Sequence, residues 1–158
     1  QAGADVYLIK PFNMDVLKMQ VSSLLENRKR IHDEFKKAPF DPDLIDVTAV
    51  EEQFIQKVVA EIERNLDNSS FTTKKLAESI GMSRTTFYNK TKAITGLKPT
   101  EFVRNYRLKI AAQYLEKGFS AKESMHRTGF NTAGYFTQSF KTLYNMTPSE
   151  YTASFKNV

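Results

Sequence analysis

The sequence contains no cysteine and only two histidines among its 158 residues. Without cysteine, the chain can form no disulfide, no cysteine-ligated zinc or iron–sulfur centre and no catalytic thiol. His32 and His126 lie far apart, and neither has a second metal ligand at helical spacing. No apolar run approaches the roughly 18 residues of a membrane span, and no signal-peptide pattern opens the chain. We therefore expect no metal, no other cofactor and no contact with a membrane.

Charge is divided unevenly along the chain. Residues 1–71 hold 9 Lys/Arg and 13 Asp/Glu, a net charge of −4, whereas residues 72–158 hold 14 and 5, a net charge of +9. A small domain this basic suits a polyanionic partner such as nucleic acid, although a solvated basic surface is the alternative. The acidic residues of the basic part are isolated from one another, so no paired carboxylates indicate an enzyme.

The first 71 residues predict one strand and two helices. The strand signal lies in residues 4–9 (ADVYLI), and Asn13 can cap a helix over 13–35. That helix carries a short heptad-like seam in which Arg28 fills one position, a pattern that suggests helix pairing: Leu17, Val21, Leu24, Ile31 and Phe35. Residues 36–48 contain two prolines and several aspartates and are typical of a linker. Apolar residues at every fourth position predict another helix over 49–66.

Short helices follow, and capping residues and glycines mark their ends. Helices are predicted over 74–80, 83–95, 99–117, 120–128 and 132–144, and Pro148 begins the last one. Part of this pattern is repeated: PTEF at 99–102 recurs as PSEY at 148–151, an offset of 49 residues. At that offset Gly96 corresponds to Asn145, which also tolerates the left-handed conformation that ends helices. The sequence therefore predicts two similar helical units joined by one long helix.

The first unit has the spacing of a helix-turn-helix. The residues predicted to fill the wedge between its helices, or to form the turn, are Leu76, Ala77, Ile80, Gly81, Met82 and Phe87. This leaves a polar outer face on the second helix, which consists of Arg84, Thr85, Tyr88, Asn89 and Lys92. Such side chains can bind phosphates and base edges, and the alternative is an exposed polar face in an ordinary helical bundle.

Residues 72–155 resemble the DNA-binding domain of the AraC/XylS family of transcription activators. The closest matches are LAESIGMSRTTFY at 76–88, TGLKPTEFVRNYRLKIAA at 95–112 and GFNTAGYFTQSFKTLYNMTPSEY at 129–151. The resemblance implies an all-α fold with a first helix-turn-helix at 72–95, a linker helix at 99–117 and a second helix-turn-helix at 120–144. It also implies that each second helix enters one of two successive major grooves of double-stranded DNA.

The family's base-reading positions can be carried over residue by residue. They fall on Thr85, Tyr88 and Asn89 in the first unit and on Ala133, Gly134, Tyr135, Thr137 and Gln138 in the second. The positions on the phosphate side are Arg84, Thr86, Lys90, Asn131, Thr132 and Lys141. The second unit departs from the family pattern, because Ser124 and Thr128 replace apolar residues and Ala133 and Gly134 offer no side-chain hydrogen bonds. We therefore expect a less stable second unit that reads thymine methyl groups or DNA shape.

Residues 3–12 (GADVYLIKPF), followed by a helix, resemble the last strand and helix of a response-regulator receiver domain. The resemblance implies switch roles for Tyr7 and Lys10, but the phosphorylated aspartate and the metal-binding acids would lie upstream. A lone strand cannot form the parallel sheet, so the segment should be inactive here. The expected organisation is a receiver remnant at 1–35, a linker at 36–48 and the DNA-binding domain at 49–158.

The combined resemblances predict the transcription-regulating output domain of a two-component phosphorelay, a piece of a longer cytoplasmic or membrane-anchored protein. No catalysis and no small-molecule substrate are expected. We expect a homodimer in the full-length protein, because one copy with an imperfect second unit reads only part of a two-groove site. The alternative is a protein–protein interaction module that has kept the fold without binding DNA.

Overall fold

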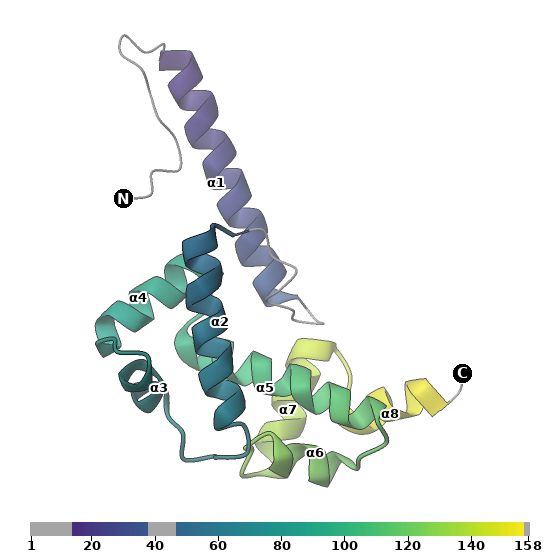
Figure 1. Cartoon of the computed structure of the whole chain (residues 1–158). Helices are drawn as coiled ribbons and strands as arrows, with labels where there is room; N and C mark the ends of the chain where they lie inside the picture. Colours follow the sequence, from purple (N-terminus) through teal and green to yellow (C-terminus); the bar gives the residue numbers. More distant parts are fainter. Residues whose placement is uncertain (1–13, 38–46, 157–158) are drawn as a thin grey trace.

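A computed structural model describes residues 14–37 and 47–156 of the chain, and all regular elements in these ranges are helices (Figure 1). The predicted all-α class is thereby confirmed for the described part, while the predicted strand at 4–9 lies outside it. The helices are α1 (Met14–Lys36), α2 (Ala49–Arg64), α3 (Thr73–Ser79), α4 (Arg84–Thr95), α5 (Pro99–Glu116), α6 (Ala121–Arg127), α7 (Ala133–Tyr144) and α8 (Pro148–Lys156).

The helix ends lie where the capping residues predict them. The hydroxyls of Thr72, Ser83 and Ser120 accept hydrogen bonds from backbone N–H groups in the first turns of α3, α4 and α6. Gly96 and Asn145 end α4 and α7 with φ values of 71° and 60°, and Asn145 is the one non-glycine residue with positive φ in the described ranges. The two copies of the sequence repeat therefore share their backbone conformation at this position.

Two hydrophobic clusters form the cores of two helical units, and α5 contributes to both. Its first half supplies Phe102, Val103 and Tyr106 to the cluster of the first unit, which is built on α2, α3 and α4. Its second half supplies Leu108, Ala111 and Leu115 to the cluster of the second unit, with α6 and α7. The linker helix thus joins the units by being part of each core (Figure 1).

A buried arginine forms hydrogen bonds with turns of both units, a contact that the sequence analysis did not predict. The guanidinium of Arg107 donates to the carbonyl oxygens of Asn65 and Asn68, at 3.3 and 3.0 Å, and to that of Gly129, at 3.4 Å. Burial lowers its pKa, whereas nearby Asp67 raises it. A Cβ at Gly129 would lie 2.6 Å from the carbonyl oxygen of Leu66, so only glycine allows this close approach. The turn after α2 is thereby held against the turn of the second unit.

Both units bury polar side chains, and some of their hydroxyl groups have no hydrogen-bond partner. Ser124 and Thr128 are fully buried, and the Thr128 hydroxyl donates to the carbonyl oxygen of Ser124 at 2.7 Å. The Ser124 hydroxyl has no hydrogen-bond partner, but neither does that of buried Thr91 in the first unit. The first unit thus has one unpaired buried hydroxyl, that of Thr91, and the second has two, those of Ser124 and Tyr144. The lower stability expected of the second unit therefore stays a prediction.

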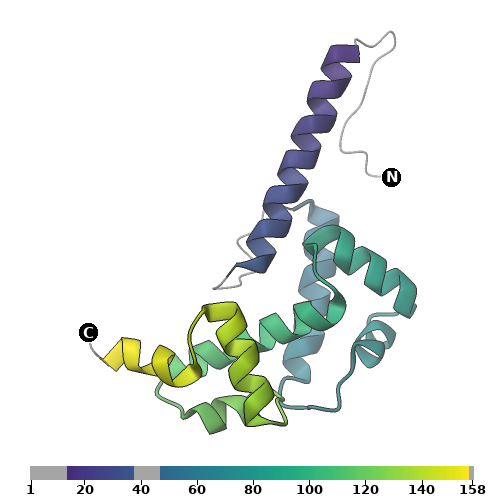
Figure 2. The same cartoon turned by 180° about the vertical axis from the view of Figure 1, so that it is seen from behind.

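The end of α1 packs directly on the first unit. Ile31 and Phe35 are buried in the first cluster, and the Phe35 ring lies 6.0 Å from that of Phe102. The beginning of α1 projects away from both units (Figures 1 and 2), and its apolar residues Val21, Leu24 and Leu25 are exposed. The predicted heptad seam is therefore divided: its last part belongs to the core of the first unit, and its first part is exposed among the described residues.

Candidate DNA-binding surface

The outer face of α4 presents the polar side chains predicted for the first unit. Arg84, Thr85, Asn89 and Lys92 are exposed, and Tyr88 is 38% exposed. The ammonium of Lys92 lies 5.9 Å from the centre of the Tyr88 ring, a cation–π contact. The opposite face carries Phe87 and Ile94 into the core. Buried residues on one face thus orient the polar face toward solvent.

Two other predicted residues of α4 make contacts within the chain. The Lys90 ammonium lies 4.6 Å above the ring of Phe54 in α2, and the side chain is half-buried. The Thr86 hydroxyl is hydrogen-bonded to that of Ser83 at 2.8 Å, so it takes part in the helix cap. Both side chains thus have contacts within the chain, Thr86 is nevertheless exposed, and their predicted place beside a phosphate stays a prediction.

The second unit presents a smaller and less polar helix face. Of the residues predicted in the turn and in α7, Thr137 is half-buried. The others are exposed: Asn131, Thr132, Ala133, Gly134, Tyr135, Gln138 and Lys141. Tyr135 is 55% exposed, and its ring lies 5.9 Å from that of Phe130, which holds it at the surface. No side chain caps the first turn of α7. Such a helix N-terminus favours an anion.

Two adjoining grooves run between α4 and α7. The first includes Arg84, Tyr88 and Lys98, and the second includes Arg104 and Tyr135. Both grooves contain Thr73 and Thr100, so they form one continuous surface from α4 to α7. No carboxylate is among the described residues that line either groove. This surface can accept a polyanion along its whole length.

Sequence reasoning missed Thr100 and Arg104 in this surface. Both lie on α5, which was predicted only to link the two units. Which of its residues are exposed depends on how both units pack against it. The Arg104 side chain is half-buried, and its contacts to the Asn105 side chain are long, at 3.4 and 3.5 Å. The spacing of the apolar residues on α5 could have indicated its exposed face. These residues lie around most of the helix circumference, however, so their spacing does not single out one exposed face.

Other kinds of site are not indicated in the described ranges. No group of three or more His, Asp or Glu side chains is placed to hold a metal ion, and no described helix is long and apolar enough to cross a membrane. The predicted receiver switch residues Tyr7 and Lys10 lie outside the described residues.

Comparison with known proteins identifies the family. Residues 76–154, half of the chain, match the family described as a helix-turn-helix domain. The chain belongs to this helix-turn-helix family. A putative AraC-like transcription regulator from Streptomyces lividans is 30% identical over 83 residues, which are 52% of this chain and 27% of that protein. The DNA-binding domain of AdpA, solved in complex with a target DNA, is 27% identical with a TM-score of 0.60, covering 65% of this chain and 93% of that domain.

The helix-turn-helix part is thus the AraC-type DNA-binding domain of a transcription regulator, and the family places it among DNA-binding domains rather than enzymes. A longer match extends beyond this domain. A protein named histidine kinase P4 from Formosa agariphila is 36% identical over 153 residues, which are 96% of this chain but 11% of that protein. The chain therefore spans about a tenth of this relative and about a quarter of the Streptomyces one.

Proposed function

We propose that this AraC-type domain binds two successive major grooves on one face of double-stranded DNA, with α4 in one groove and α7 in the next. The observation that carries the proposal is the continuous, carboxylate-free surface that joins the outer faces of these two helices. B-DNA presents its major groove once per helical turn, so two helices on a common linker can occupy successive turns.

The side chains divide by chemistry into base-reading and phosphate-binding groups. Asn89, Tyr88 and Thr85 supply hydrogen-bonding groups toward base edges from α4, and Tyr135, Thr137 and Gln138 supply them from α7. Arg84, Lys92, Asn131, Thr132 and Lys141 are suited to phosphates on the flanks. Thr100 and Arg104 face the stretch of backbone between the two grooves. Ala133 and Gly134 allow close approach of α7 and read methyl groups or shape.

We further infer that the chain is the output part of a two-component protein. The Formosa relative that matches nearly the whole chain is named a histidine kinase, and the match includes the segment before the helix-turn-helix units. In this account residues 1–35 are the end of a receiver domain, with Tyr7 and Lys10 as its switch residues, and 36–48 are a linker. Phosphorylation upstream brings two copies together as a homodimer on adjacent sites.

The experiment is selection of duplexes from a random-sequence library by the 158-residue chain, followed by hydroxyl-radical footprinting. The proposal expects a recovered sequence with two protected patches on one face, about 10–10.5 base pairs apart. Binding should weaken steeply with salt, because phosphate contacts release counterions. A single protected patch would contradict the two-groove arrangement.

Ala133 and Gly134 at the start of α7 favour the second candidate function, a protein–protein interaction module, because they offer no side-chain donors to bases. That candidate predicts no salt-dependent retention of the folded chain on any duplex. Retention with one or two footprints would exclude it.

A further inference from the structure

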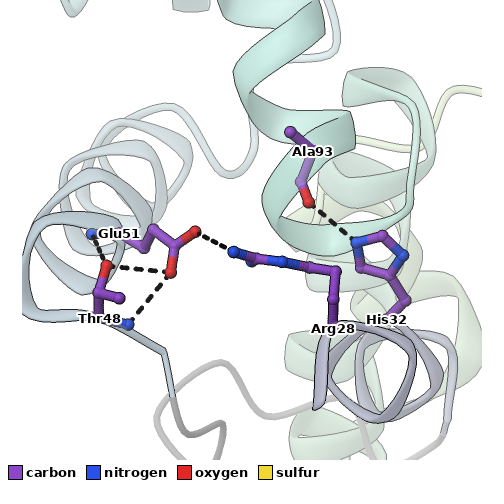
Figure 3. Close-up of polar contacts among 5 residues, drawn as sticks. All are labelled: Arg28, His32, Thr48, Glu51 and Ala93. Atoms are coloured by element: carbon purple, nitrogen blue, oxygen red, sulfur yellow. Dashed lines mark hydrogen bonds and ion pairs between the residues drawn. The ribbon is translucent and has the colours of Figure 1, made fainter. Parts of the chain in front are cut away.

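The end of α1 contacts the C-terminal end of the recognition helix α4 (Figure 3). The Nε2 atom of His32 donates a hydrogen bond to the carbonyl oxygen of Ala93 at 2.9 Å, since a carbonyl can only accept. One turn earlier, Arg28 pairs with Glu51 of α2 at 2.9 Å. Glu51 also accepts from the backbone N–H and the hydroxyl of Thr48, which caps α2. Through these two side chains α1 contacts both α2 and α4.

The hydrogen bond from His32 meets a specific need of α4. Ala93 lies in the last turn of the helix, where carbonyl groups lack partners within the helix. The N–H of Leu97, which would continue the pattern, instead donates to the Thr95 hydroxyl at 3.1 Å. The histidine from α1 therefore caps the end of α4 from outside the helix-turn-helix.

Glycine at position 96 makes room for this contact. A Cβ at Gly96 would lie 2.7 Å from Cγ and 2.9 Å from Cβ of His32. Gly96 also has a φ of 71°, a left-handed conformation that favours glycine. Glycine is therefore required here both by the backbone conformation and by the close approach of His32. Gly118 has a similar conformation, with φ 90°, but an added Cβ there would meet nothing within 4 Å. The chain thus offers a control glycine for the same backbone strain.

We propose that His32 is a positioning residue for DNA recognition by the first unit: it fixes the C-terminal end of α4 and so sets how α4 lies in its groove. This inference rests on the proposed function of α4 as a recognition helix. The base-reading side chains lie on the exposed face, whereas the core holds α4 by Phe87 and Ile94 on the opposite one. The bond to Ala93 adds a restraint at the helix end.

The test compares His32→Leu with His32→Gln in the 158-residue chain, on a duplex selected by the wild-type protein. His32→Leu removes the donor, and we expect binding to weaken about 2- to 10-fold, with fading of the footprint of α4 and an unchanged footprint of α7. Binding to random duplex should stay the same. His32→Gln keeps an N–H donor on a side chain of similar reach and should restore most of the loss.

A second pair of variants separates this role from general stability. Gly96→Ala should weaken protection at the α4 half-site more than Gly118→Ala, and adding His32→Ala should reduce that difference, because the clash with Cγ of His32 disappears and only the one with Cβ is left. Equal effects of the two glycine variants, or an α4 footprint unchanged in His32→Leu, would overturn the proposal. Both footprints fading together would also overturn it, because that result indicates only loss of stability. If the wild-type chain selects no duplex, the proposed function fails instead.

Discussion

Thr91 and Thr95 lie one turn apart on the buried side of α4, and their hydroxyl groups have opposite surroundings. The Thr95 hydroxyl donates to the carbonyl oxygen of Thr91 at 2.7 Å and accepts from the N–H of Leu97. The Thr91 hydroxyl is buried without any partner. A buried hydroxyl without a hydrogen-bond partner lowers the stability of the fold, whereas one with partners raises it.

Thr91→Val should therefore raise the free energy of unfolding by up to about 1 kcal/mol, because it removes an unpaired polar group at nearly constant volume. Thr95→Val should lower it by about 1 kcal/mol, because the carbonyl and the N–H lose their partner. Urea unfolding of both variants measures the difference. A loss of stability in Thr91→Val as large as in Thr95→Val would show that Thr91 has a partner in solution.

Asn89 belongs to the exposed face of α4, where discrimination between base pairs is expected. Asn89→Ala should cost about 1–3 kcal/mol on the selected duplex and little on random DNA, because a side-chain amide reads a base edge. Lys92→Ala serves as the control, and it should weaken both duplexes alike and reduce the salt dependence. Binding titrations on both duplexes check this. An equal loss of affinity for the selected and the random duplex in Asn89→Ala would show that Asn89 contacts the phosphate backbone instead of a base.

At the scale of elements, α1 shows how far the sequence could predict the structure. Its helix and apolar stripe were predicted, but the stripe suggested pairing with another helix along its length. Arg28 looked like an interruption, whereas it forms an ion pair with Glu51. Which element packs against an apolar face depends on contacts between residues distant in sequence, and the spacing of apolar residues within one helix does not specify those contacts. Capping residues, by contrast, act within one turn, and so the helix ends were predicted well.

The ion pair at α1 also predicts a response to acid. Burial alone would raise the pKa of Glu51, but hydrogen bonds from Thr48 and the charge of Arg28 lower it below its usual value of 4.5. A carboxylate with a lowered pKa in the folded state stabilises the fold above its unfolded pKa, and this contribution is lost as the pH falls through the folded value.

Glu51→Gln should therefore destabilise the chain at pH 7 by more than at an acid pH below the folded pKa of Glu51, where the wild-type carboxyl is protonated as well. The exposed Glu52→Gln on the same turn is the control and should have a small effect at both values. Urea unfolding at the two pH values measures the change. A deficit in Glu51→Gln that persists undiminished in acid would show that the charge of Glu51 is not what stabilises α1.

At the scale of the whole molecule, the spacing of the two units is set by α5 and Arg107. Residues of one helix enter both cores, and the guanidinium bonds to turns from both sides. The sequence predicted the two units and most of the exposed residues of α4 and α7. It missed Arg107, Thr100 and Arg104, because their roles depend on how the units meet. These contacts hold α4 and α7 at one separation in the structure.

Pairing two copies should strengthen binding without new protein–DNA contacts. A parallel coiled coil fused ahead of α1 leaves Ile31 and Phe35 in the core and joins the chains at the exposed end. On a duplex with two tandem sites, the fused dimer should bind about 10²–10⁴ times more tightly than the monomer. Titration at equal salt measures the gain. Dimers that bind no better than monomers would contradict activation by dimerisation.

In the proposed function, α4 and α7 read two grooves at one fixed spacing. The most direct measurement is the affinity of the 158-residue chain for a series of selected duplexes with 0, 2 or 5 base pairs inserted between the two half-sites. We expect that 5 inserted pairs, about half a turn of B-DNA, place the half-sites on opposite faces and reduce binding to that of one unit alone. Affinity that does not change across the series would contradict it.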